Sequence, residues 1–346
     1  MTPRLIPIDG AQGEGGGQVL RTALSLSAAT GQGFELTRIR ARRTIPGLRP
    51  QHLAAVRAAA MACDAKVGGV FEGSPDLRFE PGGLAPGDFR FEIATAGAAT
   101  LVLQTVVAPL ATTGAASRVA ITGGTHVPLS PSFDYLARHW GAAVDALGLR
   151  SEYTLERAGF YPPGGGEIHA RVEPWARPGA LRLEKRGALV KLRGVSGQAR
   201  LRNDVAQRQR DAAQARLWEA RRLEAEWEVV EVKAASPGSF LLLEAVFDKG
   251  RGAFGYLGER GVRAEIVGDR AARRLLRFLE EDGATDPCLA DQLVVPLALS
   301  GGGGLVTTTE VTAHLETVAA TAALFGVKAR VLGRRGMSGA VEVERN

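Results

Sequence analysis

Cysteine is nearly absent from this sequence of 346 residues, which contains only Cys63 and Cys288. The two cysteines stand in unrelated contexts, and no paired spacing indicates a zinc site or a disulfide framework. The N-terminal segment has neither the basic region nor the apolar region of a signal peptide. We therefore expect a cytoplasmic protein without structural disulfides.

Charged residues are missing altogether between positions 93 and 117. A stretch of this length without charge could indicate a membrane span. It contains Gly97, Gln104, Pro109 and Gly114, however, together with five threonines. This composition favours a buried helix, so we expect no membrane association.

Lysine is also scarce, because only six of the 43 basic residues are lysine and the rest are arginine. The net charge is +6 and the isoelectric point is about 9.7. Arginine side chains match the geometry of phosphate groups, so this balance suggests a polyanionic substrate such as a nucleotide or RNA. A generally arginine-rich composition explains the same numbers equally well.

Glycine, by contrast, is abundant, and its 44 residues cluster between periodic segments. Residues 4–8 have the pattern of a strand, and a glycine loop and a helix near Gly17 follow. The arrangement recurs over residues 89–110 and again over residues 290–325. Tandem copies of one unit that contains both strands and helices explain this recurrence.

The second and third copies are separated by residues 183–278, which are rich in charge. We expect a long helix over 201–226, strands over 227–234 and 239–247, and an amphipathic helix over 259–283. Residues 183–278 are therefore predicted to be an inserted α/β domain. The catalytic domain would comprise residues 1–182 and 279–346.

The first glycine loop, IDGAQGEGGGQVLR, covers residues 8–21. Backbone N–H groups between a strand and a helix N-terminus can hold phosphate oxygens. The loop matches neither of the common glycine motifs for nucleotides. It contains Glu14, which would repel phosphate unless a divalent cation lay between them. The loop thus suggests a site for metal and phosphate, with a tight turn as the alternative.

A second basic segment, residues 38–52, holds five arginines followed by Gln51 and His52. We expect a strand that leads into a loop, with alternate arginines on one side, and such a loop can clamp phosphate. A solvated basic edge strand is the alternative.

The remaining histidines are His126, His139, His169 and His314. The first three have no spacing that indicates a metal site. His314 flanks an apolar stripe of helical period, and Thr307 and Glu310 have the spacing of a capping box, so a helix is expected to start there. The stripe consists of Val311, Leu315, Val318, Ala322 and Phe325.

Five ordered motifs resemble RNA 3'-terminal phosphate cyclases from the first strand to the last helix. They are DGAQGEGGGQVLRTALSLS, RxxPGLxxQHL, ATAGAATLVLQTVVAPL, GFYPPGGGE, and LADQLVVPLAL with a histidine on the next helix. The resemblance implies an α/β (α+β) fold of three tandem βαβαββ repeats with an inserted smaller thioredoxin-like α/β domain. The inserted segment lacks C-x-x-C, so no redox role follows.

The resemblance also implies an activity. Such an enzyme is a ligase that uses ATP and Mg²⁺ or Mn²⁺ to convert an RNA 3'-phosphate to a 2',3'-cyclic phosphate, releasing AMP and diphosphate. By similarity, His314 is the nucleophile that becomes covalently adenylylated, and Glu14 is the metal ligand. The nucleotide site would comprise Gln104, Cys288, Leu289, Ala290, Asp291 and Gln292. The RNA end would be held by Arg21, Arg42, Arg43, Gln51 and His52.

The chain departs from the family pattern at two positions. Cys288 stands where tyrosine is common, so the contact that would stack on adenine is lost or supplied elsewhere. His126 stands where an acidic residue is common. The expected partner is RNA with a 3'-phosphate end, and the expected oligomeric state is a monomer or homodimer.

Two other classes of protein fit less well. A non-catalytic relative, an RNA-binding protein of ribosome assembly, would lack the nucleophile, whereas His314 and Glu14 are both present. An enolpyruvyl transferase has related repeats but needs a longer chain.

Overall fold

The computed structural model describes residues 4–175, 179–202 and 204–345. Asn203, inside the helix expected over 201–226, lies outside the described residues. Three of the four sheets share one strand order, and each follows the path βαβαββ along the chain. The mixed α/β class predicted from the sequence is confirmed.

The first repeat builds the sheet β1-β2-β4-β3, in which β1 and β2 are parallel and β4 is antiparallel to its neighbours. Its elements are β1 (Ile6–Asp9), α1 (Gly17–Thr30), β2 (Phe34–Thr37), α2 (Pro50–Cys63), β3 (Lys66–Gly68) and β4 (Leu77–Glu80).

The second repeat builds the sheet β5-β6-β8-β7 in the same way. Its elements are β5 (Asp88–Glu92), α3 (Ala99–Ala111), β6 (Ser117–Gly123), the π-helical segment η1 (Tyr135–Trp140), α4 (Gly141–Asp145), β7 (Ser151–Arg157) and β8 (Gly166–Val172). Short π-helical segments often occur at functional sites.

The third repeat builds the sheet β15-β16-β14-β9. Its elements are β9 (Leu181–Leu183), α7 (Pro287–Leu299), β14 (Gly304–Thr308), α8 (Ala313–Leu324), β15 (Ala329–Gly333) and β16 (Gly339–Val343). Strand β9 is separated from α7 by about a hundred residues, yet it pairs in parallel with β14.

The intervening residues form a separate sheet, β11-β10-β12-β13, with two helices on it. Its elements are β10 (Leu189–Ala199), α5 (Val205–Arg221), β11 (Ala225–Glu231), β12 (Gly238–Phe247), β13 (Arg251–Leu257) and α6 (Ala264–Glu280). This unit, called the inserted sheet below, has an apolar core of its own. The domain boundaries and the likeness to thioredoxin stay proposals.

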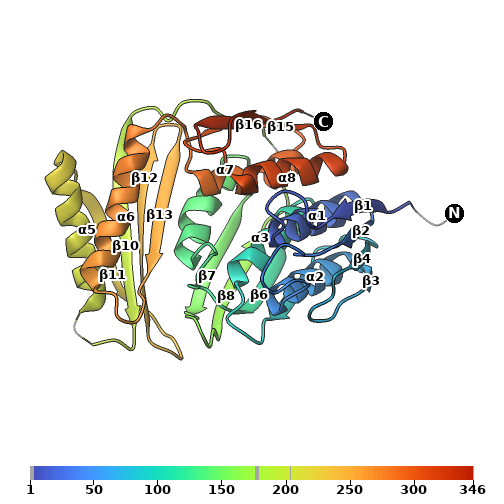
Figure 1. Cartoon of the computed structure of the whole chain (residues 1–346), viewed down its shortest axis with the longest axis horizontal. Coiled ribbons are helices and arrows are strands. Elements are labelled where there is room, and N and C mark those ends of the chain that lie inside the picture. Colours follow the sequence, from blue (N-terminus) through green and yellow to red (C-terminus); the bar gives the residue numbers. More distant parts are fainter. Residues whose placement is uncertain (1–3, 176–178, 203, 346) are drawn as a thin grey trace.

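Helix α1 is at the centre of the helical layer, where it packs against α2, α3, α7 and α8 (Figure 1). Its apolar residues Val19, Leu20, Ala23 and Leu24 are buried, and Ser25 on another face is buried as well. The Ser25 hydroxyl donates to the Thr105 carbonyl of α3 at 2.7 Å. The N-terminus of α1 is therefore held where the repeats meet.

Two local predictions were wrong. The arginine segment is not a strand, because β2 ends at Thr37 and both Arg38 and Arg40 have φ near +54°, which breaks the alternation of side chains. Helix α8 begins at Ala313 and is capped by Thr312, whose hydroxyl accepts the Leu315 N–H at 3.0 Å. Thr307 lies in β14 instead, but the predicted apolar stripe is buried throughout.

We predict that Gly268→Ala weakens the inserted sheet and its helices. Helix α6 crosses α5 at Gly268, where a Cβ would lie 2.0 Å from the Gln209 carbonyl oxygen. Overpacking of this kind costs about 1–3 kcal/mol. Denaturant unfolding should show the loss, whereas Gly83→Ala, which meets no atom within 4 Å, should leave the unfolding free energy nearly unchanged. Equal stabilities of the two variants would contradict the tight crossing.

Candidate active site

A cavity of about 710 Å³ lies where the three repeats and the inserted sheet meet. Five arginines and three carboxylates line it, so its wall carries a positive excess. These residues are Arg21, Arg40, Arg43, Arg49, Arg274, Glu14, Asp286 and Asp291. The other part of its wall is apolar and aromatic, with side chains from β12 and β13 of the inserted sheet. A ligand with an anionic end and a flat apolar end fits this lining.

The two glycines at the start of α1 allow functional side chains to lie directly over the helix end. A Cβ at Gly16 would lie 2.1 Å from Glu14 Oε1, and a Cβ at Gly17 would lie 2.5 Å from His52 Nε2 and 2.9 Å from Arg21 Nη1. Gly16 provides no side-chain cap, so the first N–H groups of α1 remain available to an anion.

Glu14 is held between the third repeat and the arginine loop. Its Oε2 lies 3.0 Å from Nε2 of His314 and 3.3 Å from Nη2 of Arg43. Its backbone N–H donates to the Thr317 hydroxyl of α8 at 3.3 Å. The histidine side chain is 49% exposed, whereas that of Glu14 is 13% exposed. An accessible imidazole nitrogen thus faces a fixed carboxylate, which is an arrangement suited to an activated nucleophile.

His52 is neutral and has a defined tautomer. Burial, together with the charges of Arg21, Arg40 and Arg49, lowers the pKa of His52 to about 3. Its Nδ1 accepts the backbone N–H of Arg49 at 3.0 Å, so the proton of the neutral ring must be on Nε2. That nitrogen points to Gly17 and can donate to an anion at the helix end.

Arg21 stays positively charged although it is enclosed. Burial lowers its pKa to about 10, and the charges of Asp291 and Glu14 oppose the shift. Burial and the charge of Asp286 raise the pKa of Asp291 well above its ordinary value, against the effect of Arg21.

Helix α7 turns one face to the cavity. The lining residues of this helix are Cys288, Asp291, Gln292, Val295 and Pro296, at helical spacing. Gln292 Oε1 accepts from Gln104 Nε2 of α3 at 2.7 Å.

The sequence had suggested the whole segment 288–292 for the nucleotide. Leu289 and Ala290 lie on the opposite face of α7, are fully buried in the core and do not line the cavity. A helix cannot direct five consecutive side chains to one face.

Of the other residues suggested from the sequence, most line the cavity and one does not. Arg21, Arg43, Gln51, His52 and Gln104 line the cavity together with Glu14 and His314. Arg42 does not line it, and its charge acts on Asp9 instead. Arg40 also lines the cavity, although the sequence analysis did not select it as a site residue as it did Arg42 and Arg43.

No metal cluster is preformed in the part of the chain that the structure describes. No group of three or more histidine, cysteine or acidic side chains there is arranged to hold an ion. Nor is any described helix both long and apolar enough to cross a membrane.

The chain is similar to known proteins of one family. A family model described as RNA 3'-terminal phosphate cyclase matches residues 12–331. A protein named RNA 3'-terminal phosphate cyclase from Ralstonia nicotianae is 47% identical, over 90% of this chain and 89% of the relative. Proteins of that name from Methylococcus capsulatus and Pyrobaculum aerophilum are 42% and 40% identical, and each alignment covers at least 90% of both chains.

The neutral state of His52 predicts a pH dependence of stability. The folded-state pKa of about 3 lies below the ordinary value of 6.5, so only the unfolded chain takes up this proton as the pH falls below 6.5. The unfolding free energy should therefore drop, by about 2 kcal/mol between pH 6.5 and 5. Denaturant titrations at the two pH values should show this drop in the wild type, and His52→Gln should lose that much less unfolding free energy over the same pH range. The same pH dependence in both proteins would show that His52 is not buried as a neutral ring.

Proposed function

This chain belongs to the RNA 3'-terminal phosphate cyclase family, and we propose that it uses ATP to convert an RNA 3'-phosphate to a 2',3'-cyclic phosphate through a covalent histidine–AMP intermediate. The observation that carries the proposal is the pair of His314 and Glu14 beside the uncapped end of α1. A nucleophile, an acid and a phosphate-binding helix end meet there, although they come from opposite ends of the chain.

The proposed reaction has three displacements. A nitrogen of His314 attacks the α-phosphorus of ATP, and diphosphate leaves. A 3'-phosphate oxygen of the RNA then attacks the phosphorus of the histidine–AMP, which frees the imidazole and forms an RNA–adenylate anhydride. The 2'-hydroxyl finally attacks the terminal RNA phosphorus, AMP leaves, and the hydroxyl proton is lost. Each displacement expels a better leaving group than oxide, and the last requires the 2'-hydroxyl of RNA.

Glu14 prepares His314 for the first displacement. The carboxylate is 3.0 Å from Nε2 and accepts the proton of that nitrogen in a hydrogen bond. Transfer of this proton from an imidazolium would expose a lone pair on Nε2. Arg43, which pairs with the same carboxylate oxygen, adds a positive charge next to the attacked phosphate.

The donor set around Glu14 fits a divalent cation that arrives with the nucleotide. Magnesium is commonly held by one or two carboxylates together with substrate phosphates, and Glu14 supplies one carboxylate next to the anionic end of the cavity. When bound there, Mg²⁺ or Mn²⁺ would neutralise part of the triphosphate charge.

The RNA end fits the arginine-rich part of the cavity. Arg21 stays charged, and His52 presents its Nε2–H beside it. Gln51 adds an amide, while Arg40 and Arg43 add forks that can hold phosphate in bidentate fashion. A terminal phosphate that is both bound and activated needs several donors of this kind.

The nucleoside of ATP fits the wall between α7 and the inserted sheet. Gln104 and Gln292 contribute amides to this wall, and β12 and β13 contribute apolar surface that includes Phe240, Ala253 and Leu257. Phe254 also borders the cavity, but its ring packs on Phe278 of α6 in the core of the inserted sheet. The apolar surface of the strands can supply the contact that a tyrosine at position 288 would otherwise provide, because Cys288 is small.

A role as a non-catalytic RNA-binding protein of ribosome assembly is not favoured, because the proposed nucleophile and its acidic partner are in contact. The cytoplasmic location and the monomeric or dimeric state stay predictions.

Labelling tests the proposal directly. Incubation with ATP labelled at the α-phosphate and with Mn²⁺ should leave acid-labile label on the wild type and none on His314→Ala. A chase with RNA that ends in a 3'-phosphate should release the label as AMP and yield a cyclic end. His169→Ala, which removes a histidine that does not line the cavity, should label normally. Absence of label on the wild type would exclude the covalent mechanism.

Glu14→Gln tests the role of the carboxylate while keeping the volume of the side chain. The amide keeps the volume but lacks the negative charge and the basicity of the carboxylate, so it cannot take up the imidazole proton and holds a cation only weakly, and the single-turnover labelling rate should fall about 100-fold. The Mn²⁺ concentration needed for half-maximal rate should also rise. Glu72→Gln, at an exposed partner of Arg49, is the matched control. Unchanged metal dependence in Glu14→Gln would refute metal binding by this residue.

A further inference from the structure

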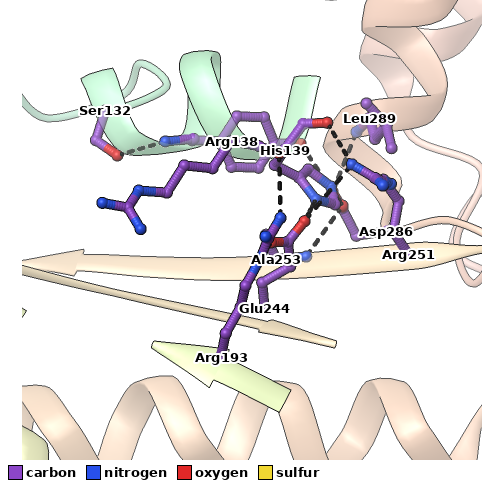
Figure 2. Close-up of polar contacts among 10 residues, drawn as sticks. Ser132, Arg138, His139, Arg193, Glu244, Arg251, Ala253, Asp286 and Leu289 are labelled. Carbon is purple, nitrogen blue, oxygen red and sulfur yellow. Dashed lines mark hydrogen bonds and ion pairs between the residues drawn. The ribbon is translucent and has the colours of Figure 1, made fainter. Parts of the chain in front are cut away.

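His139 has a place in the fold that the reaction above does not use. It lies in η1, is completely buried and does not line the cavity. Its Nδ1 is 2.8 Å from Glu244 Oε1 of β12, and its Nε2 is 2.7 Å from Asp286 Oδ2 at the start of α7 (Figure 2). One imidazole thus joins the second repeat, the inserted sheet and the third repeat.

The two contacts require a charged ring. A neutral imidazole has a single N–H, so with two ionised carboxylates one nitrogen lone pair would face a carboxylate oxygen. Both contacts are hydrogen bonds only when both nitrogens carry protons. Burial alone would lower the pKa of His139, but Asp286 and Glu244 outweigh burial and raise it. Burial alone would raise the pKa of Glu244, but His139 and Arg193 lower it to about 2.

Asp286 connects this imidazolium to the cavity. Its Oδ1 caps α7 by accepting the N–H groups of Cys288 at 3.0 Å and Leu289 at 3.1 Å. The same oxygen accepts the Tyr135 hydroxyl at 3.2 Å, and Oδ2 accepts the Ala253 N–H at 3.3 Å. The carboxylate therefore determines where the first turn of α7 lies, and this turn begins the face that lines the cavity.

Glu244 connects the imidazolium to the opposite wall. Its Oε2 accepts from Arg193 Nε at 2.6 Å, and Arg251 of β13 donates to the His139 carbonyl at 3.1 Å. Strands β12 and β13 form the apolar part of the wall. The titratable and charged groups around the ring are Tyr135 on η1, Arg193 on β10, Glu244 on β12, Arg251 on β13, and Asp286 and Cys288 at the start of α7.

We propose that His139, as a buried imidazolium, is a positioning residue for ATP that holds α7 and the inserted sheet at the separation the nucleoside requires. The inference rests on the proposed function, because it names ATP as the ligand between these walls. It assigns His139 no contact with the reacting atoms. Loss of the ring should therefore weaken nucleotide binding while the attack by His314 continues once the site is saturated.

His139→Gln tests the inference, because its neutral amide can donate to one carboxylate but cannot replace the charge. The probe is ATP whose α,β-bridging oxygen is replaced by methylene, which cannot transfer AMP to histidine. With Mg²⁺, calorimetry should show a Kd about tenfold above that of the wild type. The labelling rate at saturating ATP should stay within about twofold. An unchanged Kd would overturn the inference.

Arg138→Gln is the matched control. It removes the paired contacts of Arg138 with Glu228, at 2.6 and 2.8 Å, which also join η1 to the inserted sheet but do not touch Asp286. Its Kd should equal that of the wild type. An equal rise in both variants would mean that any loosening of this interface weakens binding, and would overturn the specific role of His139.

A double variant separates positioning from stability. His139→Gln with Glu244→Gln removes one of the two buried carboxylates that lose the imidazolium, while the new amide oxygen can still accept from Arg193, so the thermal midpoint should recover relative to His139→Gln. The Kd should stay raised, because Asp286 still lacks its cation. Recovery of both quantities together would show a purely structural role.

The wild type provides an independent test that needs no variant. Nitrogen NMR of histidine-labelled protein at pH 7.5 should show both ring nitrogens of His139 protonated, and a singly protonated ring would overturn the inference. Failure of the proposed function would differ from these outcomes, since the wild type would then bind the analogue without ever acquiring label from ATP.

Discussion

The close approach at the N-terminus of α1 is the constraint on which the other features of the site depend. Gly16 and Gly17 have no side chains, so the carboxylate of Glu14, the imidazole of His52 and the guanidinium of Arg21 can all lie over the start of the helix. A Cβ at either position would collide with one of these groups. The glycines thus serve two purposes, because they expose the first N–H groups of α1 and allow the side chains to converge on the same point.

Helix packing determines which side chains converge. α1 contacts helices from all three repeats, so its N-terminus has a fixed position relative to α8, which carries His314, and α7, which carries Asp291 and Gln292. Gly13 packs so closely against Thr317 that a Cβ there would lie 2.2 Å from the hydroxyl. Residues from the first and last segments of the chain are therefore joined by the same packing that builds the core (Figure 1).

Burial shapes the electrostatics of the cavity as much as the number of charges does. Burial and the same arginines that make the wall positive keep His52 neutral, and burial and the charge of Asp286 raise the pKa of Asp291. His52, which is ionisable in water, thus becomes a hydrogen-bond donor of fixed direction. Deeper in the protein the opposite holds, because two buried carboxylates keep His139 charged.

Local patterns in the sequence determined the repeats and most helices, because glycine loops and apolar periodicity act between near neighbours, whereas most residues of the candidate site followed from the family resemblance. The arginine segment was wrongly predicted as a strand. Arg38 and Arg40 have positive φ angles in a loop, and no periodic pattern in the sequence indicates such a loop. Residues 288–292 were assigned to the nucleotide from the family resemblance as one segment, although helix geometry turns Leu289 and Ala290 to the core.

Only the tertiary structure decided the long-range pairs. His139 meets Glu244 and Asp286 across 105 and 147 residues, and Glu14 lies beside α8 across about 300. No local spacing signals these contacts, because packing of separate units brings the groups together. The sequence by itself therefore determined which chemical groups are available, and burial and packing decided which of them meet and in which protonation state.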